Sequence, residues 1–147
     1  MSSGQRNLVE GKYPGQTMIP RQTENRKLTV GFQVTTREVG GIIVVDAVGR
    51  LTLSDSRTQL RDLIHVFCGN GHKKFLLNLA GVDFMDSDGM GELVRCYSIV
   101  RQGSGEMKLV QVNQKVQELL QVTRLNTLFE IYGEERVALQ AFMSLQK

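Results

Sequence analysis

The residues from Ile42 to Val48 constrain the fold most, because they form a β-branched run that is apolar apart from Asp46. The run is too short for a buried helix, and such residues are typical of strands with both faces covered. It therefore predicts a central strand with side chains packed on both sides. The segment from Phe75 to Leu79 has a similar character and predicts a second core strand.

Around these strands, apolar residues recur at the i, i+3, i+4, i+7 spacing of a helix. The first set, at positions 60, 63, 64 and 67, predicts a helix that ends near Gly69-Asn70-Gly71, with Ser56 and Gln59 as its capping box. Three more helices are predicted from later stripes, which are Met90, Leu93, Val94 and Tyr97; Val116, Leu119 and Leu120 after a cap at Asn113; and Val137, Ala138, Ala141, Phe142 and Leu145. Glu92 and Arg95 fall off the first of these stripes, which is expected to face the sheet.

Weaker signals predict the remaining strands of the same sheet. They are an alternating pattern at residues 32–37 followed by a Gly40-Gly41 turn, a short strand at Leu109-Val110, and an edge strand within residues 129–132. Two opening strands followed by alternating helix and strand predict one α/β domain. Its mixed sheet should have about four to five strands, with about four helices packed on it.

Residues 1–29 have a different character from the rest of the chain. They contain both prolines, show no apolar periodicity, and carry five basic residues against two acidic ones, a net charge of +3. We expect this segment to be a disordered N-terminal extension. The remaining residues, 30–147, carry 13 basic and 13 acidic side chains. Because this part has no basic patch, direct nucleic-acid binding is not expected.

Several kinds of chemistry lack the residues that they need. Cys68 and Cys96 have no CxxC or Cys/His ligand spacing, and His65 and His72 have no companion at a ligand interval, so no metal site is predicted. The chain contains no GxSxG, GxGxxG or GxxxxGK[ST] motif, so neither a catalytic serine nor a nucleotide loop is indicated. No apolar run suits a secretory signal or a membrane span, which predicts a cytoplasmic protein without a membrane partner.

The most distinctive segment runs from Gly81 to Gly91, between a core strand and a predicted helix. Asp86, Ser87 and Asp88 could each accept hydrogen bonds from the free amides of the helix's first turn, and helix capping alone would explain any one of them. One cap suffices, however, and the flanking glycines permit close approach of another backbone. A serine on such a strand-to-helix loop would also be well placed to carry a phosphate.

The motif that includes Asn78-Leu79 and the residues from Val82 to Gly91 resembles the signature of the STAS domain family. That family includes bacterial anti-sigma-factor antagonists and sulphate-transporter tails. The resemblance covers about residues 30–145 and implies a STAS domain at 30–147, with residues 1–29 outside it. It also implies that Ser87 is a phosphoacceptor and that the chain is a partner-switching protein, not an enzyme. The implied partners are a serine kinase that doubles as the anti-sigma factor and a metal-dependent serine phosphatase.

The resemblance further implies a partner-binding surface around Ser87, formed by Asp86, Asp88, Gly89 and Met90, with Arg50 and Thr52 on a neighbouring loop. ATP and magnesium would belong to the partners, so no cofactor is expected on this chain. Two residues depart from the family pattern. Asp88 stands where many relatives have serine or threonine, and Thr52 stands where an acidic residue is frequent. Two alternatives remain open: a scaffold or small-ligand sensor in which Ser87 is only a helix cap, and a hydrolase that uses Ser87.

Overall fold

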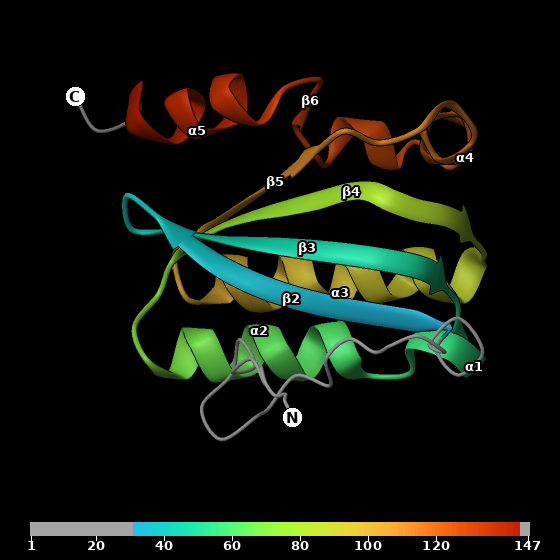
Figure 1. The fold of residues 1–147 in the computed structure, drawn as a ribbon, viewed down its shortest axis with the longest axis horizontal. Helices are drawn as coiled ribbons and strands as arrows, with labels where there is room; N and C mark the ends of the chain where they lie inside the picture. The colour runs from blue at the N-terminus through green and yellow to red at the C-terminus, as the bar shows by residue number, and fades with distance from the viewer. Residues whose placement is uncertain (1–30, 145–147) are drawn as a thin grey trace, which may run out of the picture.

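Five strands form one sheet in the order β2-β3-β4-β5-β6 in the computed structural model, which describes residues 31–144 (Figure 1). The strands are β2 (Phe32–Val39), β3 (Ile42–Leu51), β4 (Lys74–Met85), β5 (Glu106–Val110) and β6 (Ile131–Tyr132). The helices are α1 (Leu53–Ser56), α2 (Gln59–Gly69), α3 (Ser87–Gln102), α4 (Gln114–Val122) and α5 (Glu135–Ser144), with a short 3₁₀ helix, η2 (Leu125–Thr127). The expectation of a mixed α/β sheet with about four substantial helices is confirmed.

The sheet is mixed because its first strand pair is a hairpin. β2 pairs with β3 in antiparallel register through the Gly40-Gly41 turn, where both glycines have positive φ values of 57° and 84°. Positive φ at both central residues is what a tight two-residue hairpin turn requires. The pairs β3–β4, β4–β5 and β5–β6 are all parallel, so helical crossovers connect them.

Side chains are buried on both faces of the sheet. The larger core cluster lies on the face covered by α2 and α3, and includes Val45, Leu77 and Leu93. The smaller cluster lies beneath α5 on the other face, where Val44 and Phe142 are fully buried (Figure 1). Helices therefore cover both faces of β3 from Ile42 to Val45, as the β-branched run predicts, whereas Val48 at the end of that run is 53% exposed.

Both core strands are longer than expected. Their parallel pairing continues to Leu51 opposite Met85, with register shifts on the way, so Gly49, Arg50 and Leu51 belong to β3 and not to a loop. The predicted capping box at Ser56 is also wrong. Ser56 is buried in α1, where its hydroxyl donates to the Thr52 carbonyl oxygen at 2.6 Å.

The helical stripes are confirmed except at Val94, Val137 and Ala141. Val94 and Ala141 are only half-buried and belong to neither core cluster. Val137 is 39% exposed, because α5 turns the adjacent Ala138 toward the sheet instead. Glu92 is buried between α2 and α3, where Arg61 donates to both carboxylate oxygens at 3.1 Å. Cys96 is a buried free thiol whose pKa is raised by burial. Leu145 and the predicted extension at 1–29 lie outside the described residues.

Candidate functional site

The N-terminus of α3 is built by Asp86, the residue between the end of β4 and the helix. Asp86 has extended backbone angles, and its Oδ1 accepts a hydrogen bond from the Gly89 amide at 2.8 Å. Its carbonyl oxygen accepts the Met90 amide at 2.9 Å. Of the three possible caps, Asp86 is therefore the one in use.

Ser87 is the first residue of α3 and its side chain is exposed. The expectation that it lies on a loop is wrong, because β4 continues to Met85 and a single residue makes the junction. The described hydrogen bonds provide no acceptor for the amides of Ser87 and Asp88. These amides stand at the positive end of a 16-residue helix, where an added negative charge is favoured.

Gly89 fixes the position of this helix end against the end of β3. A Cβ at Gly89 would collide with the carbonyl oxygen of Leu51, and that same oxygen accepts the Asp86 amide at 3.4 Å. Gly89 is buried and Met90 is 6% exposed, so the expectation that they lie on the surface is wrong. Their role is to hold the segment that presents Ser87.

We expect Gly89→Ala to lower the free energy of unfolding by about 1–3 kcal/mol, as overpacking usually does. The added methyl group would press on a backbone carbonyl, which cannot rotate away as a side chain could. Urea denaturation followed by circular dichroism measures the loss.

Gly91→Ala is the matched control for this prediction. A Cβ at Gly91 would meet only the Arg95 guanidinium, at 3.5 Å. Alanine is the better helix former by about 0.5–1 kcal/mol, so this variant should be as stable as the wild type or slightly more stable. Equal losses in both variants would contradict the role given to Gly89.

Thr52 and Arg50 lie next to this helix end but differ in exposure. Thr52 is 5% exposed and caps α1, accepting the Asp55 amide at 3.0 Å and donating to Asp55 Oδ2 at 2.9 Å. The expectation that Thr52 is exposed beside Ser87 is therefore wrong. Arg50 is exposed, pairs with Asp55 at 3.2 Å, and stacks on the Phe84 ring at 5.0 Å. Asp55, three residues after Thr52, places a carboxylate beside both of these residues.

A family model described as the STAS domain matches residues 33–138, which contain this site and nearly the whole sheet. The chain belongs to the STAS domain family. Among its relatives, the anti-sigma F factor antagonist of Paenibacillus polymyxa is 27% identical over 110 residues, or 75% of this chain and 94% of that protein.

Solved structures share this STAS fold. An anti-sigma factor antagonist from Mycobacterium paratuberculosis has a TM-score of 0.67 at 20% identity, over 75% of this chain and 92% of that one. The Bacillus cell fate determinant SpoIIAA in its phosphorylated form has a TM-score of 0.59 at 20% identity, over 76% of this chain and 98% of that one.

Sequence reasoning missed three exposed side chains near the site. Val48 is 53% exposed, Leu53 64% and Phe84 44%. Val48 and Phe84 lie in the second halves of β3 and β4, where exposed and buried residues mix, and Leu53 opens α1 directly after Thr52. Phe84 lies three residues before Ser87 in the sequence, and this proximity was the only indication that its side chain belongs near the site.

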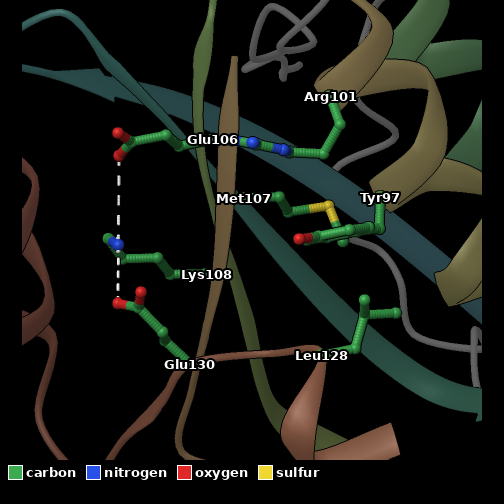
Figure 2. A pocket seen from close by; sticks show the side chains of 7 residues that line it. All are labelled: Tyr97, Arg101, Glu106, Met107, Lys108, Leu128 and Glu130. Atoms are coloured by element: carbon green, nitrogen blue, oxygen red, sulfur yellow. Dashed lines mark hydrogen bonds and ion pairs between the residues drawn. The ribbon is translucent and has the colours of Figure 1, made fainter. Parts of the chain in front are cut away.

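A cavity of about 120 Å³ lies elsewhere on this STAS domain, beside β5, and none of its lining residues belongs to the Ser87 segment. Lys108 is buried there and lies between Glu130, at 2.7 Å, and Glu106, at 3.9 Å (Figure 2). Lys108 lowers the pKa of Glu130, while burial and a hydrogen bond to Glu130 raise the pKa of Tyr132 to about 12. The two basic side chains that line the cavity, Arg101 and Lys108, are balanced by two acidic ones, Glu106 and Glu130.

Two further features are absent from the described part of this STAS domain, residues 31–144. No three His, Cys, Asp or Glu side chains gather there in a way that could hold a metal ion. No helix within those residues has the length and apolar character to cross a membrane.

Proposed function

We propose that this STAS domain protein is an anti-sigma-factor antagonist whose binding to its partner is controlled by phosphorylation of Ser87. The observation that carries the proposal is the position of Ser87, an exposed hydroxyl at the first position of α3 that the helix does not need as a cap. This position also argues against the alternative in which Ser87 is only a helix cap. The names of the relatives support the choice of partner class.

A phosphate on Ser87 would be tolerated by the fold. It adds a charge of about −1.5 to −2 at neutral pH, next to Asp86 and Asp88. The free amides and dipole of the α3 N-terminus favour an anion there and offset part of the repulsion. Phosphorylation should therefore lower the affinity for the partner much more than it lowers the stability of the fold.

The partner surface that we propose is narrower than the sequence alone indicates. Ser87, Asp88 and Arg50 would contact the partner directly, and the half-buried Asp86 would lie at its margin. Thr52, Gly89 and Met90 would instead hold α1 and α3 in place beneath that surface.

The chain itself would catalyse no reaction in this scheme. The anti-sigma factor, acting as a serine kinase, would transfer the terminal phosphoryl group of ATP to Ser87 Oγ, and the hydroxyl proton would be lost. The serine phosphatase would return the hydroxyl by hydrolysis. Unphosphorylated protein would bind the anti-sigma factor and so release the sigma factor.

Phosphate mapping tests this proposal. The unphosphorylated protein is used to capture its partner from an extract of its native cells, and the captured complex is incubated with ATP and magnesium. We expect mass spectrometry to find one phosphate, on Ser87. Ser87→Ala should accept none, whereas Ser54→Ala, which removes an exposed serine in α1, should behave as wild type. Full phosphorylation of Ser87→Ala would refute the proposal.

A further inference from the structure

The ends of β3 and β4 form a surface that no described element covers. We call it the strand-end surface and define it by its exposed residues, which are Val48, Arg50, Leu53, Asp83, Phe84, Ser87 and Asp88. Arg50 lies opposite Phe84 in the sheet register, and the Asp86 amide donates a hydrogen bond to the Leu51 carbonyl oxygen. The two strand ends and the start of α3 are therefore contiguous. Three of its side chains are large and apolar, which is typical of a surface that something covers.

The same surface carries unbalanced negative charge. Asp83 and Asp88 are exposed, and neither they nor Asp86 has an ion-pair partner among the described residues. Arg50, the cation that stacks on Phe84, is already paired with Asp55. A cationic segment with some apolar side chains would therefore complement this surface.

The chain itself supplies such a segment at this end of the sheet. The Gly31 carbonyl oxygen accepts the Arg50 amide at 2.7 Å, so residues 1–30 join the domain directly beside the strand-end surface. Those residues carry Arg6, Lys12, Arg21, Arg26 and Lys27 against Glu10 and Glu24, with Leu8, Val9, Tyr13, Met18 and Ile19 between them.

The residues that join the basic side chains to the domain are long enough to allow this contact. Gly31 is the fifth residue after Arg26, and five extended residue steps span at most about 18 Å. Gly31 and the β4 end lie about two strand spacings apart, or about 10 Å. A short tether also gives an effective concentration in the millimolar range, so weak charge pairing suffices for docking.

We propose that residues 1–30 dock on the strand-end surface and cover Ser87, so that the N-terminal segment competes with any partner for that site. The basic side chains pair with Asp83, Asp86 and Asp88, and the apolar ones cover Val48 and Phe84. The inference does not depend on phosphorylation of Ser87, and its test uses neither kinase nor partner.

Paramagnetic broadening in the full-length chain tests this docking. A nitroxide is attached at Thr23→Cys in a Cys68→Ser background, since Cys96 is fully buried. We expect the amide signals of Phe84, Ser87 and Asp88 to be broadened. The amides of Gly40 and Gly71, in turns at the other end of the strands, should be little affected.

A neutralised segment is the matched control, because a tethered label near Gly31 broadens nearby signals even without docking. Arg21→Gln, Arg26→Gln and Lys27→Gln bring the charge of residues 1–29 from +3 to zero. In this variant the signals of Phe84, Ser87 and Asp88 should be broadened less than in the wild-type segment, because only the effect of the tether remains. It should also be lost for the wild-type segment in 1 M salt, where the Debye length falls from about 10 Å to about 3 Å.

Two results would overturn the inference. One is equal broadening in the wild-type and neutralised segments, which would mean that the segment only samples the space near its attachment. The other is broadening of an unlabelled ¹⁵N chain mixed with a spin-labelled chain at natural isotope abundance, which would assign the surface to a second copy of the protein.

Discussion

Leu93→Ala should lower the free energy of unfolding by about 2–5 kcal/mol, the usual range for large-to-small changes in a packed core. Leu93 is fully buried in the middle of α3, within the larger core cluster that joins this helix to the sheet. Alanine would leave a cavity that α3 cannot close, because Gly89 holds its N-terminus against the Leu51 carbonyl. Urea denaturation at constant temperature measures the loss.

Val94→Ala is the control for this prediction, since Val94 is the next residue of α3 and only half-buried. It should cost clearly less than Leu93→Ala. A loss below about 0.5 kcal/mol for Leu93→Ala is the size expected of a surface substitution. Such a result would mean that α3 does not pack as described.

Ser87→Glu should weaken binding to the anti-sigma factor by about 5- to 150-fold, the range of an ordinary coupling energy. The added carboxylate would join Asp86 and Asp88 in one helical turn, where a partner that fits a small neutral hydroxyl must either desolvate it or lose contact. Titration calorimetry against one purified partner measures the change. Ser87→Ala should keep the affinity of the wild type.

Ser98→Glu is the matched control, because Ser98 is an exposed serine on the same helix. It lies 11 residues beyond Ser87, about 16 Å along the helix axis, and should bind as the wild type does. Circular dichroism and the melting transition of Ser87→Glu should stay native, because the α3 N-terminus favours an anion. Loss of the native spectrum would assign the weaker binding to unfolding and contradict this account.

The order of strands and helices was predictable because each element carries its own apolar period. The run from Ile42 to Val48 is too short and too rich in β-branched residues for a buried helix, so it predicts a strand, and Gly40-Gly41 sets the hairpin that joins it to β2. The lengths of β3 and β4 were not predictable. Their last residues are held by pairing between Arg50 and Phe84, and between Leu51 and Met85, which is a property of two strands together.

The site was predictable as a segment and not as a set of exposed side chains. Sequence spacing gave three possible caps, and only the geometry of the β4–α3 junction selects Asp86. Glu92 falls off the apolar stripe, yet Arg61 reaches it from α2 and allows its burial. Thr52 is buried for a similar reason, since Asp55 folds back on it. Such pairings between polar side chains leave no periodic signal in the sequence.

Calorimetric titration of the Ser87-phosphorylated protein itself tests the central claim most directly. The phosphorylated and unphosphorylated forms are titrated with the same anti-sigma factor, after mass spectrometry has established one phosphate on Ser87 in the first form. The account predicts that the phosphorylated form binds at least about 5-fold more weakly, and that phosphatase treatment restores the affinity. Equal affinities of the two forms would contradict the claim that phosphorylation of Ser87 controls binding.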